Sequence, residues 1–493
     1  MSSMRRYRTR SRSKLAGAWR ATAIAMVVVA LGVTASAAAA NVNIVRQGEA
    51  PAKVPPGTTY FKTIQGAVNA STSGDYVLVE PGTYYESVKV TSAQSGIWIR
   101  GMNRNTVIVD GQNKPGNGIE IYKTNNVWVE NLTVRNFDTG CENCGNEIWW
   151  NGGTGTAKVG AHGWFGAYLT AYDTGLNGSY GIFTGHETEG SWNNIYASGF
   201  NDSGMYLGAC QECNATITGA TMENNALGYS GSNSGGKLVI QQSLFRNNSA
   251  GIVPNSENPG DEPPPQDGEC GRPNIENPEP TPIISTTNIQ RCTIIRNNRI
   301  TENNNLTVPV NGTTAQAGFG TGVILPGVYA DLIESNVITR NANDGVFGIE
   351  FPNPFTPENG FLGTIFFQLA GNRISKNEFN RNGYHLRSPF AGDVTLASGA
   401  SEIFLGVESQ SKNNCLSSNS FSDGTFPKSI QSKWNCTNRT TPNPGGGLAA
   451  YEYIQAAAQE AAALRKPVGQ PAPPPQPTMP NPCEGAPKNP LCK

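Results

Sequence analysis

Three side chains that could transfer protons lie close together in the segment Tyr180-Gly-Ile-Phe-Thr-Gly-His186-Glu187. Histidine is the one side chain whose ordinary pKa is near neutral, so it can serve as a base or an acid at physiological pH. The chain has only three histidines. His162 lies in a segment rich in Gly and Trp, and His385 follows an Asn-rich turn, whereas His186 follows an apolar run. We therefore take Tyr180, His186 and Glu187 as candidate catalytic residues. The alternative is that His186 is an exposed turn residue without a role.

Tryptophans cluster around this segment in the sequence. The candidate substrate-binding residues are Trp149, Trp150, Trp164 and Trp192. Aromatic rings beside Asn, Asp and Glu suit sugars, because the C–H face of a sugar stacks on a ring while its hydroxyl groups need hydrogen-bond partners. The same tryptophans could equally be packing residues of a core or a loop.

The elements that must position these residues belong to a repeat. Asn201, Asn224-Asn225 and Asn247-Asn248 recur every 23 residues, and each is followed by a Gly that opens an apolar run. Short β-branched patches between turns rich in Asn and Gly predict strands. A step of this length fits one coil of a β-solenoid, in which coils stack about 4.8 Å apart. The repeated Asn side chains are then expected to form a hydrogen-bonded ladder at one corner.

The start of this repeat resembles a known family. Phe61-Lys-Thr-Ile-Gln65, followed by Gly74-Asp-Tyr-Val-Leu-Val-Glu-Pro-Gly-Thr-Tyr-Tyr-Glu86, resembles the opening of right-handed parallel β-helix proteins of the pectin-lyase-like superfamily. The later coils resemble the β-helix repeat domains of secreted bacterial proteins. The resemblance covers about residues 57–425. It implies an all-β fold, a right-handed parallel β-helix, with an N-terminal capping helix and looped insertions.

Helical spacing of apolar residues near Thr63 agrees with this. Ile64, Ala67 and Val68 predict a short helix that covers the open first coil. Further along, the phrase that begins at Asn298 returns at Asn336, Asn377 and Asn419 with steps longer than one coil. We therefore expect loops to project from one corner and to mark the binding side.

The chain divides into three predicted parts. Residues 1–40 read as a signal peptide, with a basic start, an apolar run and a small-residue cleavage site; an uncleaved anchor is the alternative. Residues 41–440 form the β-helix domain. Residues 441–493 contain an Ala-rich helix and a Pro-rich tail, interpreted as a cap or appendage.

Charge and cysteines limit the environment and the partners. Removal of the leader leaves 29 Lys and Arg against 37 Asp and Glu, which disfavours a nucleic-acid partner. An even number of cysteines in local pairs predicts disulfides and an oxidising, extracellular location. The expected pairs are Cys141–Cys144, Cys210–Cys213, Cys270–Cys292, Cys415–Cys436 and Cys483–Cys492. A zinc site shared by the two C-x-x-C pairs is disfavoured, since three coils would hold them about 14 Å apart.

The resemblance alone leaves the activity open. Pectin methylesterase activity is disfavoured, because the aspartates, arginine and glutamines of its later motifs have no counterpart here, and no Asp cluster with an Arg matches the pectate lyases. The segment from Tyr180 to His186 resembles the Tyr-Gly-aromatic-Asp-Pro-His signature of β-helix alginate epimerases and lyases, although its Asp-Pro pair is missing and its His is displaced by one residue. In that family, Tyr and His exchange the C5 proton of the sugar.

Two hypotheses follow. The first is a secreted polysaccharide lyase or C5-epimerase acting on uronate polymers, with Ca²⁺ considered as a cofactor because the substrate carboxylate must be neutralised. The second is a non-catalytic extracellular or cell-wall protein that binds glycan or serves as a scaffold. In both, the partner is a polysaccharide or a cell-surface glycan. We expect a monomer without a stable membrane span once the leader is removed.

Overall fold

Three long parallel sheets run through the computed structural model, which describes residues 40–492 except 154–159, 211, 257–291, 311–317, 353–365, 386–387, 407, 410 and 439–440. Sheet A has thirteen strands, in the order β2 (Thr58–Phe61), β1 (Val42–Val45), β3 (Tyr76–Val79), β6 (Trp98–Gly101), β9 (Val127–Glu130), β13 (Trp164–Ala167), β17 (Gly190–Asn193), β20 (Ala215–Thr218), β23 (Leu238–Gln241), β26 (Thr293–Arg296), β29 (Leu332–Glu334), β34 (Arg373–Ser375) and β37 (Cys415–Ser417).

Sheets B and C run beside it. Sheet B has ten strands, in the order β35 (Glu378–Asn380), β30 (Val337–Thr339), β27 (Arg299–Thr301), β24 (Leu244–Arg246), β21 (Thr221–Glu223), β18 (Tyr196–Ser198), β14 (Thr170–Tyr172), β10 (Thr133–Asp138), β7 (Val107–Pro115) and β4 (Gly82–Tyr84). Sheet C has eleven, in the order β38 (Thr425–Phe426), β36 (Gly392–Ala397), β31 (Asp344–Ile349), β28 (Thr321–Pro326), β25 (Ala250–Asn255), β22 (Leu227–Ser232), β19 (Ser203–Gly208), β15 (Tyr180–Gly185), β11 (Asn146–Asn151), β8 (Asn117–Tyr122) and β5 (Val88–Val90).

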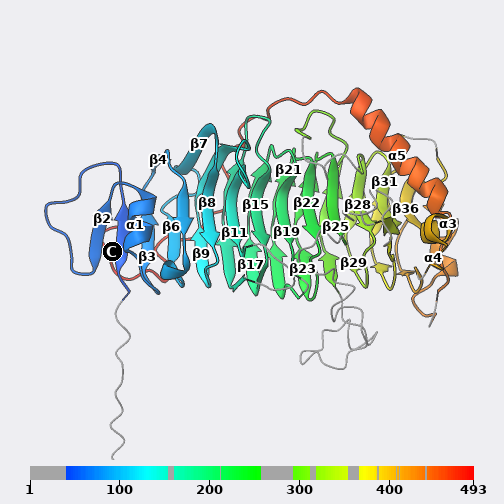
Figure 1. Ribbon diagram of the computed structural model, residues 1–493, viewed down its shortest axis with the longest axis horizontal. Helices are drawn as coiled ribbons and strands as arrows, with labels where there is room; N and C mark the ends of the chain where they lie inside the picture. Colours follow the sequence, from blue (N-terminus) through cyan, green and yellow to red (C-terminus); the bar gives the residue numbers. More distant parts are fainter. Residues whose placement is uncertain are drawn as a thin grey trace, which may run out of the picture. The chain divides into compact units, whose positions relative to one another are not determined.

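Each coil between the two ends of the solenoid contributes one strand to sheet A, one to sheet B and one to sheet C, and the next coil stacks on it (Figure 1). Ile217 pairs with Ile240 in sheet A, and Met222 pairs with Phe245 in sheet B. These side chains point inward and are completely buried. Apolar residues at alternate positions therefore fill one continuous core, as the pleat of a strand requires. The predicted right-handed parallel β-helix is confirmed.

A repeated backbone conformation turns the chain at the corner between sheets B and C. One residue with φ between +54° and +60° follows the sheet B strand, and a buried Asn comes next. The pairs are Asn224-Asn225, Asn247-Asn248, Glu302-Asn303, Arg340-Asn341 and Arg381-Asn382. The left-handed residue reverses the side-chain alternation, so that the following amide points into the solenoid.

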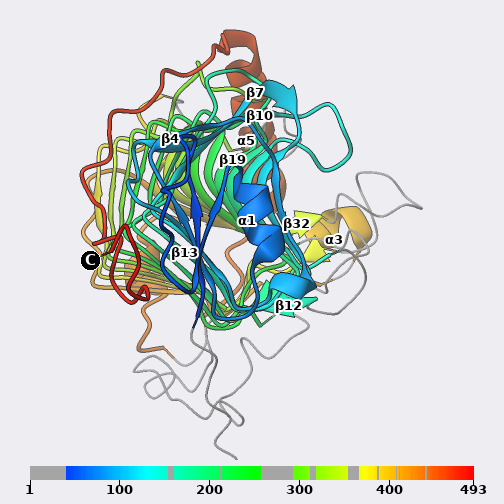
Figure 2. The same cartoon turned by 90° about the vertical axis from the view of Figure 1, so that its left-hand side faces the viewer.

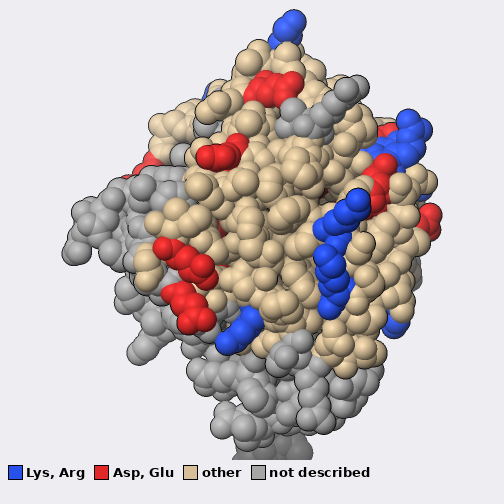
Figure 3. Space-filling view, turned by 90° about the vertical axis from the view of Figure 1, so that its right-hand side faces the viewer, with Lys and Arg blue, Asp and Glu red and all other residues tan. Residues whose placement is uncertain are grey.

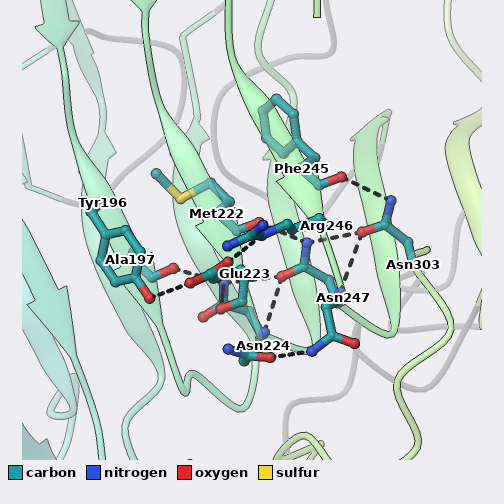
Figure 4. Close-up of polar contacts among 11 residues, drawn as sticks. Tyr196, Ala197, Met222, Glu223, Asn224, Phe245, Arg246, Asn247 and Asn303 are labelled. Atoms are coloured by element: carbon teal, nitrogen blue, oxygen red, sulfur yellow. Dashed lines mark hydrogen bonds and ion pairs between the residues drawn. The ribbon is translucent and has the colours of Figure 1, made fainter. Parts of the chain in front are cut away.

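The buried amides form the predicted ladder. Asn225 Nδ2 donates to Asn248 Oδ1 (3.1 Å), and Asn248 Nδ2 donates to Asn303 Oδ1 (2.9 Å). The chain of bonds continues through Asn341 to Asn382 at 3.1 and 3.0 Å. Figure 4 shows part of this corner, with Asn303 bonded to the carbonyl of Phe245.

Outside the ladder, the side chain of Asn247 donates to Asn224 at the surface (Figure 4). A second ladder, between sheets A and B, joins Asn298, Asn336, Asn377 and Asn419 at 2.9–3.1 Å. Its last member, Asn419, donates to the side chain of Gln431 in the short helix α4 (Ile430–Lys433), which ends the row at the C-terminal coil.

The first coil is covered by helix α1 (Ile64–Ala70), as predicted (Figure 2). Its residues Ile64, Ala67 and Val68 are buried. Both carboxylate oxygens of Glu86 accept backbone N–H groups from the first helical turn, at 2.8 and 2.9 Å. The Tyr-Tyr-Glu phrase of the family resemblance thus caps this helix, because a carboxylate satisfies donors that the helix itself leaves unpaired.

The C-terminal segment lies along the solenoid instead of over its end (Figures 1 and 2). Helix α5 (Gly447–Leu464) packs on the outer face of sheet C, where Tyr453 contacts Phe347 and donates to Asp344 Oδ2 at 2.9 Å. The Pro-rich tail then returns to the first coils. Gln476 and Asn105 exchange two hydrogen bonds, and the loop closed by Cys483–Cys492 packs near Tyr76.

Long connections leave the coils at two corners, not at one as expected. Residues 302–320 join sheet B to sheet C, whereas residues 350–372 join sheet C to sheet A. Both corners flank sheet C. Helix α3 (Ala400–Leu405) lies in a later connection, between β36 of sheet C and β37 of sheet A. Residues 92–94 form a single 3₁₀ turn.

Charged side chains do not gather by sign at the C-terminal end of the solenoid. Figure 3 shows a few Lys and Arg and a few Asp and Glu side chains on a mostly uncharged face, some of them side by side.

The ladder predicts a specific loss of stability. Replacing Asn341 with Leu removes the acceptor of the Asn303 amide and backbone N–H, both buried. We expect the free energy of unfolding to fall by about 1–3 kcal/mol, since buried donors are left unsatisfied. The matched control is Asn380→Leu on exposed strand β35, which should change it by less than about 0.5 kcal/mol. Equal urea midpoints for both variants would contradict the structural role of the ladder.

Candidate functional site

A hollow of about 380 Å³ lies on the outer face of sheet C, over strands β11, β15 and β19. Pockets that bind small ligands have volumes of roughly 300–1,000 Å³. Side chains that point away from the core line its floor, because alternate residues of each strand face outward. The lining residues are Asn143, Cys144, Asn146, Trp149, Asn151, Gly153, Ser179, Tyr180, Phe183, Gly185, His186, Tyr206, Gly208 and Ala209.

Aromatic rings form the floor of the hollow. Strand register places Trp149, Phe183 and Tyr206 next to one another in consecutive coils. The rings of Trp149 and Phe183 stack at 4.9 Å with planes 8° apart. Tyr206 meets Phe183 edge to face at 4.8 Å, and Tyr180 meets Tyr206 edge to face at 5.0 Å. This mixture of stacked and edge contacts is the favoured geometry for aromatic pairs and makes the floor rigid.

Amides and glycines complete the surface. Asn151 Nδ2 donates to Glu120 Oε1 at 2.9 Å, and Asn146 Nδ2 donates to Asn117 Oδ1 at 2.9 Å, so both amides are held in place. A Cβ atom at Gly208 would lie 2.4 Å from the Tyr206 hydroxyl oxygen. A glycine is therefore required here for the tyrosine ring to lie along the sheet.

His186 sits at the corner where strand β15 ends. Its φ of +58° lies in the left-handed region, which His tolerates better than most side chains. The backbone is held on both sides, since its N–H donates to Gly208 at 3.3 Å and its carbonyl accepts from Gly160 at 2.8 Å. His186 and Tyr180 both line the hollow. They occupy opposite ends of one strand, with their Cα atoms about 20 Å apart.

Glu187 does not reach this hollow. It occupies the inward position after the left-handed corner, it is 1% exposed, and both of its carboxyl oxygens lack a hydrogen-bond partner among the described residues. Burial raises the pKa of Glu187 well above its ordinary value. The position of Glu187 inside the solenoid argues against direct contact with a ligand on the outer face, and its predicted catalytic role stays a prediction.

The tryptophans separate in the same way. Trp150, Trp164 and Trp192 are completely buried and form a cluster inside the solenoid, with the rings of Trp164 and Trp192 4.8 Å apart. Their burial fits the core-packing alternative, and their predicted contact with substrate stays a prediction that this placement does not support. Trp149 alone faces the hollow.

Sequence reasoning did not single out Phe183 and Tyr206, although a signal for them exists. They are separated by one repeat, directly after the inward residues Ile182 and Met205. Outward aromatic residues at the repeat spacing thus indicate a row on the surface. The other histidines lie elsewhere: His162 is exposed, and His385 faces Glu460 with Nε2 3.4 Å from the carboxylate.

The hollow carries little charge. No Lys, Arg, Asp or Glu is among its lining residues, and the described part of the chain has no group of three His, Cys, Asp or Glu side chains placed to hold a metal ion. Ca²⁺ stays a prediction. Lys123 approaches the rim, where a Cβ atom at Gly153 would lie 3.0 Å from its Nζ.

Disulfides border and support this region. The local pairs Cys141–Cys144, Cys210–Cys213, Cys415–Cys436 and Cys483–Cys492 are confirmed. Cys292 is also disulfide-bonded, while Cys270, its expected partner, lies outside the described residues. Sulfurs of both C-x-x-C pairs are therefore not available as thiolate ligands for zinc. Of the helices that the structure describes, none has the length and hydropathy of a membrane span.

Comparison with known proteins finds similarity of fold alone. No protein-family model and no curated protein matches the chain. Among solved structures, the A-module of mannuronan C-5 epimerase AlgE4 from Azotobacter vinelandii is 12% identical, with a TM-score of 0.40 over 73% of this chain and 90% of that one. An alginate lyase from Paenibacillus sp. FPU-7 is 11% identical, with a TM-score of 0.34 over 74% and 93%. Pectate lyase Pel9A is 13% identical, with a TM-score of 0.36 over 74% of each chain.

The buried carboxyl of Glu187 predicts how stability depends on pH. Its raised pKa means that the folded protein keeps a proton that the unfolded chain loses above about pH 4.3, so this group lowers stability as pH rises toward its folded pKa. Glu187→Gln should therefore become increasingly more stable than the parent from pH 5 to pH 8, as measured by chemical denaturation.

The exposed neighbour Glu189 provides the control. Glu189→Gln should follow the parent at every pH, since its side chain is 65% exposed. A constant difference between Glu187→Gln and the parent across this range would show that Glu187 titrates normally in the folded protein. Three parallel sheets in successive coils make this chain a parallel β-helix.

Proposed function

We propose that the hollow on sheet C binds a glycan, and that the protein acts as an extracellular polysaccharide-binding protein. The observation that carries this is the lining itself, in which four aromatic rings lie beside three Asn side chains. Sugar rings need apolar surface for their C–H faces and amides for their hydroxyl groups. The disulfides support a location outside the cytoplasm.

The lining favours an uncharged glycan over a uronate. Lyase and epimerase reactions form an enolate next to the sugar carboxylate, and this needs cationic stabilisation close to the reacting carbon. The hollow offers no Lys or Arg on its surface, and Glu187, one of the three expected catalytic groups, lies inside the core. Binding without turnover is consistent with both observations.

The binding test uses Trp149 and a matched tryptophan elsewhere. Trp149→Ala removes a ring from the floor and should weaken binding of neutral oligosaccharides by about tenfold or more. Trp128→Ala is the control, because Trp128 is partly exposed and stacked on Trp98 at 4.3 Å but lies on sheet A. Calorimetric titration against neutral glucans, galactans and mannans measures both. Unchanged affinity in Trp149→Ala, or an equal loss in Trp128→Ala, would place the glycan elsewhere.

A uronate lyase or epimerase is the second candidate, favoured by one observation. Tyr180 and His186 line the same hollow, and Lys123 stands at its rim as a partner for a carboxylate. Proton transfer at C5 would then require both side chains to lean toward one sugar from opposite ends of β15.

His186→Asn tests this candidate without disturbing the corner, because Asn tolerates the left-handed backbone. If the enzyme hypothesis holds, activity on alginate, pectate or glycosaminoglycans with Ca²⁺ falls by about 10²-fold while the thermal unfolding midpoint stays the same. Absorbance of unsaturated uronate products and NMR exchange at C5 report the activity. No turnover by the parent protein on this panel, together with binding of neutral glycans, favours the binding protein.

A further inference from the structure

The first strand of the fold begins directly after the predicted leader. Strand β1 starts at Val42 and lies between β2 and β3 in sheet A, with hydrogen-bonded neighbours on both sides. Val42, Ile44 and Val45 are at most 1% exposed. The backbone at Asn41 is also held, since its carbonyl accepts from Tyr76 N at 2.9 Å. The position of Asn41 is therefore set by the sheet.

A buried carboxylate faces this point. Asp75 is 3% exposed, and its Oδ1 accepts the backbone N–H of Asn41 at 2.7 Å and the Asn41 side-chain amide at 3.2 Å. Its Oδ2 accepts the N–H and the hydroxyl of Thr72, at 2.8 and 3.0 Å. All of these donors are neutral, and within the described ranges Asp75 forms no ion pair with Lys, Arg or His. A buried carboxylate without a countercharge is costly.

We propose that the Ala40–Asn41 bond is a processing site, and that cleavage there creates an N-terminal ammonium group on Asn41 that becomes the missing partner of Asp75. Hydrolysis of this amide adds one water, leaving a carboxylate on Ala40 and an ammonium on Asn41. The nitrogen that already lies 2.7 Å from Asp75 Oδ1 then carries the positive charge. A charge-assisted bond of this length is stronger than the peptide N–H bond that it replaces.

The structure selects this bond from several that the sequence allows. Residues 35–40 read Ala-Ser-Ala-Ala-Ala-Ala, and a peptidase that requires small residues before its cleavage site could cut at more than one of them. A cut farther upstream leaves a neutral peptide N–H at Asn41. Cleavage before Asn41 gives up only the half-buried methyl group of Ala40, which packs near Cys492.

The first experiment identifies the N-terminus of the exported protein. Full-length chain is expressed in a bacterial host with a secretion pathway, and the product is analysed by intact mass and N-terminal sequencing. We expect a single N-terminus at Asn41. A dominant N-terminus at any other residue, or retention of the leader, would overturn the proposal.

The second experiment tests the ion pair itself. Two mature proteins are compared, one beginning at Asn41 and one retaining Ala40, each with and without Asp75→Asn. With Asp75 present, the form beginning at Asn41 should have a Tm about 2 °C higher near pH 6. Asp75→Asn should abolish this difference, because the carboxylate is gone.

The pH dependence gives an independent readout. Pairing with Asp75 raises the pKa of the new amino group above its ordinary value of about 7.7–8.0. The extra stability is then complete below that value and is lost as pH rises through the raised pKa. Melting the four proteins from pH 6 to pH 11 should therefore show the advantage of the Asn41 form disappearing at high pH only when Asp75 is present. Equal Tm values for the two N-termini at pH 6 would overturn the ion pair.

Discussion

The left-handed corner is the constraint on which the rest of this structure depends. A coil that turns in two residues leaves backbone groups facing the interior, where no water can satisfy them. The Asn side chains after each corner supply both a donor and an acceptor, so that one amide serves its own coil and the next one. Strand register in all three sheets follows, because a shift by one residue would turn every amide and apolar side chain outward.

The same constraint separates the core from the site. Since inward positions are committed to packing and to the ladders, chemistry can only be placed on outward positions and in the loops. Trp149 and Trp150 illustrate this division, as adjacent residues of one strand that end on opposite faces of sheet C. The outer face of sheet C has two parts. Helix α5 packs on its C-terminal part through Tyr453, and the aromatic floor of the hollow lies on the part that α5 leaves uncovered.

The fold could be predicted from the sequence because its signals are local and repeated. The spacing of Asn225, Asn248 and their equivalents predicts the length of one coil. Glu86 belongs to the phrase that predicts the capped helix at the first coil. The site could be predicted only in part. Assigning Glu187 to the interior requires knowing that His186 adopts a positive φ, which an Asn or Gly at that position would have suggested and a His does not.

Other features depended on contacts between residues far apart in the sequence. The path of the Pro-rich tail cannot be read from its composition, since it is determined by single hydrogen bonds to residues more than 370 positions away, such as those to Asn105 and Arg104. The second corner with insertions was missed for a related reason. The number of residues between equivalent Asn positions shows that a coil contains an insertion. The corner at which the insertion leaves the coil depends on which strand precedes the insertion.

The returning C-terminal tail links the two ends of the solenoid. Stacked repeats behave as a one-dimensional array, in which terminal units open first and independently of each other. Here the segment that follows the last coil is fastened to the first ones: Arg104, buried and bonded to Thr478, and Arg100, bonded to the carbonyl of Glu484, hold it there. The tail thus adds contacts between the first coils and the segment after the last one, and a simple linear array of repeats has no such contacts.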